Sequence, residues 1–123
     1  MDADELKKRT KQFGLQVIKL IESLPSSKAA NVIGNQLLRS GTSVGANYRA
    51  ACRARTKPDF ISKAGISIEE ADESLYWMEM LVEAGIMPKE KLRALMKEAD
   101  EIVAILTASV KTARASINPR GSQ

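Results

Sequence analysis

Basic side chains are the residues of this chain whose types and spacing best fit a chemical task, the binding of phosphate groups. They form one cluster near the start of the chain and a second around residue 50: Lys7, Lys8, Arg9 and Lys11, then Arg49, Arg53, Arg55 and Lys57. Clusters of this kind contact nucleic-acid phosphates without reading the bases, and the resulting affinity falls as salt rises. We therefore predict that these eight residues contact RNA or DNA. A solvated basic face without a ligand is the alternative.

Two carboxylates, Glu70 and Glu73, lie three residues apart in the second half of the chain. Paired carboxylates can serve as general acid and base, but no neighbouring residues indicate a substrate pocket. Because an unpaired buried carboxylate is costly, we expect both to meet hydrogen-bond donors, within the chain or in another copy. The candidate donors are Arg39, Ser43, Asn47 and Tyr48.

Histidine is absent and Cys52 is the single cysteine. These counts exclude the usual Ser-His and Cys-His nucleophilic sites, a Cys/His zinc site and a Glu-x-x-His di-iron site. The segment from Gly41 to Gly45 lacks both the preceding strand and the Gly-Lys-Ser/Thr ending of a phosphate-binding loop. Cys52 is predicted to be a small apolar helix residue. We expect no catalytic residue, cofactor or metal, and hence a protein that is not an enzyme.

The composition predicts one soluble domain in a reducing cytoplasm. Of 123 residues, 44% are hydrophobic and 28% charged, with no signal peptide expected at the acidic N-terminus and no apolar stretch near the ~20 residues that span a bilayer. The net charge of +4 is uneven, since residues 1–57 carry 11 basic and 4 acidic side chains and residues 58–123 carry 8 and 11. The basic first half could pair with the acidic second half, within one chain or between copies. Alternatively, the basic half could attract an anionic partner.

Apolar periodicity and capping signals predict four helices separated by short breaks. The helices are expected over about residues 4–24, 28–55, 57–84 and 88–116. Ser26 or Ser27 can cap the second helix, Thr56 can cap the third, and Gly85 suits the end of the third. Short connections favour antiparallel neighbours, so we predict an all-α, up-down-up-down four-helix bundle over residues 1–117. Residues 118–123 are predicted to be a disordered tail.

The predicted second helix has small and polar residues on the face where a helix usually buries large apolar ones. On a helical wheel five residues lie within about 40° of Ile33: Leu37, Ser40, Val44, Asn47 and Ala51. Ser40 and Asn47 should therefore be buried and hydrogen-bonded internally. The glycines of this helix each weaken it by up to ~1 kcal/mol, for which close approach of a neighbouring helix is the expected compensation.

The predicted third helix carries two stripes at the same spacing. The first is the expected bundle core: Ala64, Ile68, Ala71, Leu75, Met78 and Val82. The second lies roughly opposite on the helical wheel: Ile66, Glu70, Glu73, Trp77, Met80 and Ala84. A monomeric bundle needs one apolar face, so we predict self-association through this second stripe, apart from Ala84. The alternative places Trp77 at a bundle edge under a helix of its own chain.

Several segments resemble the bacterial "four helix bundle protein" family, which includes proteins encoded in intervening sequences of large-subunit ribosomal RNA genes. The segments that carry this resemblance are Leu38-Arg39-Ser40, Thr42-Ser43-Val44-Gly45-Ala46-Asn47-Tyr48, Ala51-Cys52-Arg53-Ala54, Glu69-Glu70-Ala71-Asp72-Glu73 and Tyr76-Trp77. It covers about residues 5 to 115. Many family members have an acidic Glu-Gly after the Asn segment, where this chain has Arg49-Ala50-Ala51.

The family is similar in fold to the accessory protein of diversity-generating retroelements, a pentameric barrel that binds nucleic acid through a basic surface and partners a reverse transcriptase. The resemblance thus implies a homopentamer and no catalytic residues. It also implies that six polar residues maintain the fold or the assembly: Arg39, Ser40, Ser43, Asn47, Glu70 and Glu73. We predict an RNA- or DNA-associated accessory protein. An oligomeric protein-interaction scaffold without nucleic-acid binding is the alternative, and an enzyme would require a deep polar pocket around Glu70 or Glu73.

Overall fold

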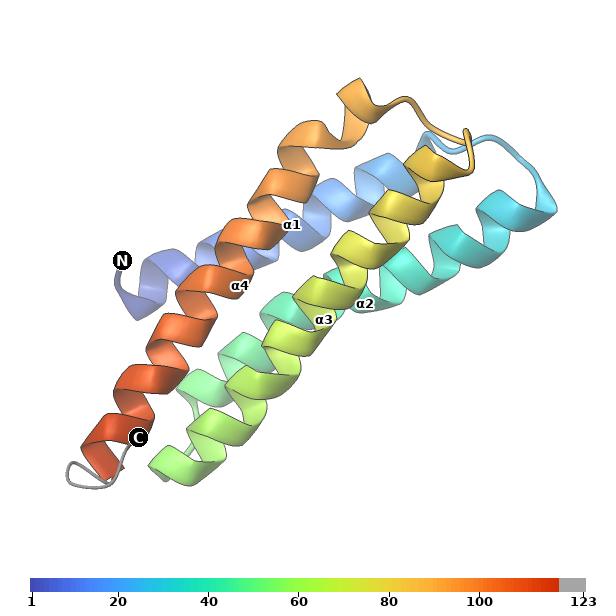
Figure 1. The fold of residues 1–123 in the computed structure, drawn as a ribbon. Coiled ribbons are helices and arrows are strands. Elements are labelled where there is room, and N and C mark those ends of the chain that lie inside the picture. The colour runs from blue at the N-terminus through green and yellow to red at the C-terminus, as the bar shows by residue number, and fades with distance from the viewer. Residues whose placement is uncertain (118–123) are drawn as a thin grey trace.

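Four long antiparallel helices make up the part of the chain that the computed structural model describes, residues 1–117 (Figure 1). They are α1 (Ala3–Glu22), α2 (Lys28–Cys52), α3 (Lys57–Glu83) and α4 (Lys89–Ile117). The predicted all-α, four-helix architecture is confirmed. The tail predicted at residues 118–123 lies outside the described residues.

Capping side chains fix where the helices begin. Ser27 accepts a hydrogen bond from the Ala30 amide, and Thr56 accepts one from the Asp59 amide, as the sequence indicated. Asp2 adds a capping box with Glu5 at the start of α1, which the sequence reading overlooked. Gly85 follows α3 with φ of 72°, a conformation that favours glycine. The predicted end of α2 was three residues too long, because the helix ends at Cys52.

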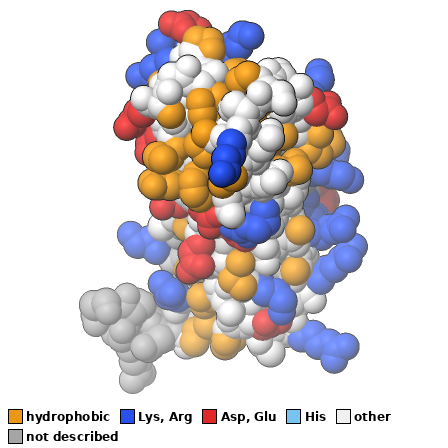
Figure 2. All heavy atoms as spheres, turned by 90° about the vertical axis from the view of Figure 1, so that its right-hand side faces the viewer, with side chains coloured by type: hydrophobic (Ala, Val, Ile, Leu, Met, Phe, Trp, Pro, Cys, Tyr) orange, Lys and Arg blue, Asp and Glu red, His pale blue; other side chains and the backbone are white. Residues whose placement is uncertain are grey.

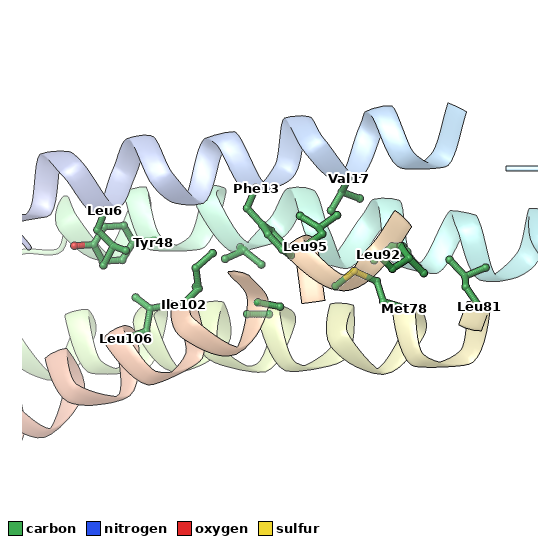
Figure 3. Close-up of a cluster of buried hydrophobic side chains, with 14 of the residues drawn as sticks. Leu6, Phe13, Val17, Tyr48, Met78, Leu81, Leu92, Leu95, Ile102 and Leu106 are labelled. Atoms are coloured by element: carbon green, nitrogen blue, oxygen red, sulfur yellow. The ribbon is translucent and has the colours of Figure 1, made fainter. Parts of the chain in front are cut away.

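The helices pack in sequence order, α1 on α2, α2 on α3 and α3 on α4, while α1 and α4 meet over a much smaller surface. Large apolar side chains from α1, α3 and α4 converge in the interior together with Tyr48 of α2 (Figure 3). The apolar face of α1 is buried from Leu6 to Val17, whereas Leu20 and, just beyond the helix, Leu24 are only half-buried. The part that α1 contributes to the core is therefore complete over its first four turns and thinner at its C-terminal end.

Glycines let the backbones of α1 and α2 approach closely. A Cβ added at Gly41 would lie 2.7 Å from Val17 Cγ2, and one at Gly45 would lie 3.2 Å from the carbonyl oxygen of Thr10. Gly14 faces Gly41 across the same crossing, where an added Cβ would lie 3.5 Å from the Gly41 carbonyl oxygen. The close approach expected for the glycines of α2 is thus present, and its partner is α1.

Serines join α2 to α3 inside the bundle. Ser40 is fully buried, and its Oγ lies 2.9 Å from Ser74 Oγ, which donates to it. Ser67 Oγ donates to the Val44 carbonyl oxygen over 2.7 Å. The expectation of internal hydrogen bonding holds for Ser40. Asn47 also has an internal hydrogen bond, to the Ser43 carbonyl oxygen of its own helix, but it is half-buried where full burial was expected.

The buried stripe of α3 differs from the predicted one. Its members are Ala64, Ser67, Ala71, Ser74, Met78 and Leu81. The predicted core residues Ile68, Leu75 and Val82 are only half-buried at its side. Because the two serines hydrogen-bond to α2, they occupy the centre of the contact and turn the large apolar side chains toward its edge. The prediction from hydrophobicity alone was therefore wrong at Ile68, Leu75 and Val82.

Candidate nucleic-acid interface and self-association surface

A groove of about 380 Å³ runs along the outside of the α1–α2 pair. The close crossing at Gly14 and Gly45 leaves no large side chain on its floor. Lys8, Lys11 and Arg49 are exposed around it. Leu15 and Ile18 also line the groove and are 51% and 37% exposed. The groove therefore combines cations with an apolar wall, a feature that the charge clusters alone did not predict.

A second hollow, of about 610 Å³, lies where α2 ends and α3 begins. Four basic side chains line it, together with Asp59, Thr56 and three alanines; the basic ones are Arg49, Arg53, Arg55 and Lys63. Lys63 forms an ion pair with Asp59 at 2.8 Å, whereas none of the three arginines has an ion-pair partner among residues 1–117. The two hollows share Ala46 and Arg49, so they form one continuous surface along α2.

Five of the eight predicted phosphate-binding residues meet on this continuous surface with free side chains, and a sixth lines it while paired. The free ones are Lys8, Lys11, Arg49, Arg53 and Arg55. Lys7 lines the groove but lies 3.1 Å from Asp4 in an exposed ion pair. Lys57 does not line either hollow and donates a hydrogen bond to Ser116 Oγ at the far end of α4. Five of the eight basic residues thus share one surface with free side chains, and their contact with RNA or DNA stays a prediction.

The prediction that Arg9 contacts phosphate is wrong, because its guanidinium binds two carboxylates of its own chain. It lies 2.6 Å from Glu98 and 2.6 Å from Glu101, both on α4, and only 24% of its side chain is exposed. The hydrogen bond from Arg9 to Glu98 is the main cause of a raised Arg9 pKa. Arg9 therefore holds α1 against α4 where these helices otherwise have little contact. Sequence spacing could not distinguish it from Lys8 and Lys11.

Arg39, Glu70 and Glu73 form an ion cluster between α2 and α3. Arg39 donates to both oxygens of Glu70, at 2.9 and 3.2 Å, and to Glu73 Oε2 at 2.5 Å. Trp77 Nε1 donates to the same Glu73 oxygen over 3.0 Å. The Trp77 bond and then the Arg39 bond lower the pKa of Glu73. Both carboxylates thus meet donors within one chain, and neither lines the two hollows described above.

The other members of the predicted polar cluster serve α2 itself. Ser43 Oγ donates to the Arg39 carbonyl oxygen over 2.6 Å, one turn earlier in the same helix. With the Asn47 bond to Ser43, this makes a short chain of side-chain bonds along the helix. Ser43 and Asn47 therefore take no part in binding Glu70 or Glu73, and Arg39 alone among the candidate donors does so.

The outward side of α3 carries apolar and acidic residues together. Ile66, Tyr76 and Met80 are 41%, 51% and 36% exposed. Trp77 is half-buried, and its ring meets that of Tyr76 edge-on, with centroids 5.0 Å apart. Residues 64–84 contain six acidic and no basic side chains. Of the predicted self-association residues, Ile66 and Met80 are the ones left exposed by their own chain.

Apolar and charged surface lie next to each other elsewhere as well. On the face shown in Figure 2, hydrophobic side chains gather in the upper half and Lys and Arg side chains follow the right-hand edge.

Among residues 1–117 no three His, Cys, Asp or Glu side chains converge as a metal site would require. Within the same residues, no helix has the length and apolarity needed to cross a bilayer.

Comparison with known proteins decides the family. Residues 4–108 match the family described as 23S rRNA-intervening sequence protein. The chain belongs to this family. A solved structure from Bacteroides thetaiotaomicron, a protein of unknown function from the S23 ribosomal protein family, is similar to this chain. It has 33% sequence identity and a TM-score of 0.81, with 86% of this chain and 98% of that chain covered. No curated protein sequence matches the chain.

Proposed function

We propose that this protein is a non-enzymatic, self-associating accessory protein that binds RNA or DNA through backbone phosphates. The observation that carries the proposal is the hollow at the end of α2, where Arg49, Arg53 and Arg55 have no ion-pair partner among residues 1–117 and the lining carboxylate, Asp59, is paired with Lys63. Guanidinium groups bind phosphate oxygens with two parallel hydrogen bonds, so three of them around one hollow suit a sugar-phosphate backbone.

The charge distribution supports this assignment. Residues 23–58, which include all of α2, contain no acidic side chain. The positive potential of this surface is therefore not cancelled by its own helix, and it would speed the approach of a polyanion. Arg49 and Arg53 carry the contact in this proposal, with Arg55 beside them, while Arg9 is excluded by its bonds to α4.

Self-association is the second part of the proposal. Exposed Ile66, Tyr76 and Met80 give α3 an apolar outer side that its own bundle does not cover. The resemblance to pentameric relatives favours a ring of five, in which the arginine hollow would be repeated. Repetition strengthens a weak phosphate contact through multivalency. We place the protein in the cytoplasm, which agrees with Cys52 as a free thiol.

An oligomeric scaffold that binds protein instead of nucleic acid is the alternative. The apolar wall of the α1–α2 groove, with Leu15 and Ile18, favours it, because phosphate binding has no use for exposed aliphatic side chains. The name of the 23S rRNA-intervening sequence protein family links it to ribosomal RNA genes, which favours nucleic acid for this chain.

Salt-dependent binding tests the proposal. Fluorescence anisotropy with labelled duplex DNA would give the dissociation constant over a salt series, with single-stranded RNA as a second probe. Replacing Arg49 and Arg53 by Gln should weaken binding and reduce the slope of log K against log salt by about 1.8 on duplex DNA, since each phosphate contact contributes about 0.9. The matched control is Lys91→Gln with Lys111→Gln on α4. The proposal would be contradicted if the arginine and lysine double variants lowered the affinity equally, or if the dissociation constant did not change with salt concentration.

A further inference from the structure

The outward side of α1 carries two lysines followed by two apolar residues. Lys8, Lys11, Leu15 and Ile18 recur at intervals of three, four and three, which places them on one stripe of the helix. All four are exposed, and all four line the α1–α2 groove. Phosphate binding explains the lysines but not the exposed Leu15 and Ile18. This end of the basic surface thus differs from the arginine hollow.

The outward side of α3 has the complementary order. Moving toward the C-terminus, the acidic residues Glu69 and Asp72 come first, followed by the apolar residues Tyr76 and Met80. All four are exposed. Neither Glu69 nor Asp72 has an ion-pair partner among residues 1–117. Their charges are therefore available to a second molecule.

We propose that the outer side of α3 in one copy docks into the α1–α2 groove of a second copy of this chain. This inference rests on the self-association in the proposed function and names the surfaces that carry it. The two stripes match residue by residue when the helices lie parallel: Lys8 with Glu69, Lys11 with Asp72, Leu15 with Tyr76 and Ile18 with Met80. The numbering offset is 61 for the first three pairs and 62 for the last.

Charge favours one direction of docking. In the parallel register each lysine meets a carboxylate and each aliphatic side chain meets an apolar one. The antiparallel alternative would leave Glu69 and Asp72 unpaired and would offer the two lysines only Glu83, so it would form one ion pair instead of two. Complementary charges of this kind select one register and suppress others, while the buried apolar residues supply most of the affinity.

The topology of the bundle agrees with this register. Helices α1 and α3 run in the same direction in one chain, because the four helices alternate. They lie diagonally across the bundle, without close backbone approach within the described residues, so their outer sides are separate surfaces. Rotation about an axis along the bundle keeps helix direction, and it brings α3 of one copy parallel to α1 of the next. Such a head-to-tail contact closes into a ring when the rotation allows it.

Charge reversal tests the docking directly. Two variants each reverse one surface: Lys8→Glu with Lys11→Glu, and Glu69→Lys with Asp72→Lys. Each should lower the mass measured by light scattering to the 13.4 kDa of one chain, at concentrations where the unmodified protein is assembled. The chain that carries all four changes should assemble again, because attraction is restored. Circular dichroism checks that each variant keeps its helices, and Lys91→Glu with Lys111→Glu is the matched control, which should stay assembled.

Cysteine cross-linking provides a measurement that does not depend on charge-reversed variants. Leu15→Cys with Tyr76→Cys, in a Cys52→Ser background, should form disulfides between copies on mild oxidation and give a ladder on a non-reducing gel. Absence of cross-linked species would overturn the docking mode, as would assembly that survives both charge reversals. If the unmodified protein is monomeric at every concentration, self-association itself fails. The Arg49 and Arg53 binding assay tests the phosphate contact separately, because a single chain can still bind nucleic acid in a salt-dependent way.

Discussion

Arg39 and Trp77 donate to the same oxygen of Glu73, Arg39 from the neighbouring helix α2 and Trp77 from the next turn of α3. The bond from Trp77 and then that from Arg39 lower the Glu73 pKa, while half of the Arg39 side chain stays in solvent. Trp77 is therefore held partly by its own chain, as the bundle-edge alternative supposed. The outer residues Tyr76 and Met80 are the ones left for another molecule.

Acid should weaken the Arg39–Glu73 contact. Because the folded-state pKa of Glu73 lies below the unfolded value, its contribution to stability is present above about pH 4.3 and is lost as pH falls through the lowered folded-state pKa. Glu73→Gln should therefore lower Tm at pH 7 and converge with the unmodified protein near pH 3. The difference should be small, because 35% of the Glu73 side chain is exposed and solvent screens the charge. Asp100→Asn, at an exposed position of α4 without an ion-pair partner among residues 1–117, should leave Tm unchanged.

Alanine substitutions at Gly41 and Gly65 should change the stability of the protein in opposite directions. A Cβ at Gly41 would lie 2.7 Å from the side chain of Val17, whereas one at Gly65 would have nothing within 4 Å. Gly41→Ala should destabilise the protein, because overpacking of about 1–3 kcal/mol exceeds the gain in helix propensity. Gly65→Ala should stabilise it by up to ~1 kcal/mol. Urea unfolding measures both, and a stabilising Gly41→Ala would mean that α1 and α2 are farther apart than described.

Arg9 should matter for stability and not for nucleic-acid binding. Arg9→Gln removes ion pairs with Glu98 and Glu101 across the sparse α1–α4 contact, so the free energy of unfolding should fall by about 1–2 kcal/mol. Affinity for duplex DNA should stay the same at fixed salt, unlike that of Arg49→Gln. If Arg9→Gln lost affinity for duplex DNA without losing stability, Arg9 would belong to the nucleic-acid binding surface.

Ser67 and Asn47 should differ although both are polar residues near the α2–α3 contact. Ser67→Ala removes a buried bond to the Val44 carbonyl oxygen and should lower the free energy of unfolding by about 1 kcal/mol. Asn47→Ala removes only a bond within α2, and alanine is the better helix former, so its effect should be near zero. Chemical denaturation of both variants compares them, and equal losses would show that Asn47 has a partner in another helix or another copy.

The sequence predicted the helices well because caps, breaks and apolar spacing are local signals. It also predicted that Glu70 and Glu73 would meet donors, with Arg39 among the candidates. It failed at positions that depend on tertiary contacts. Ser67 and Ser74 are buried because α2 supplies their hydrogen-bond partners, and Arg9 is withdrawn from the basic surface because Glu98 and Glu101 lie opposite. No helical wheel of a single helix contains that information.

The α1–α2 groove could have been found in part from sequence. Leu15 and Ile18 continue the three-four spacing of Lys8 and Lys11, which marks a second, outward stripe on α1. What spacing could not supply is the glycine crossing that leaves the floor open beside them. The contrast between this groove, with its exposed Leu15 and Ile18, and the arginine hollow therefore needed the structure.

The most direct test of the central claim is the mass of the protein in solution, measured by light scattering with and without mixed RNA and DNA at low and moderate salt. We predict an assembly of five 13.4-kDa chains whose mass rises with nucleic acid at low salt and falls back at moderate salt. A mass of one chain that nucleic acid leaves unchanged would contradict both the self-association and the phosphate binding proposed here.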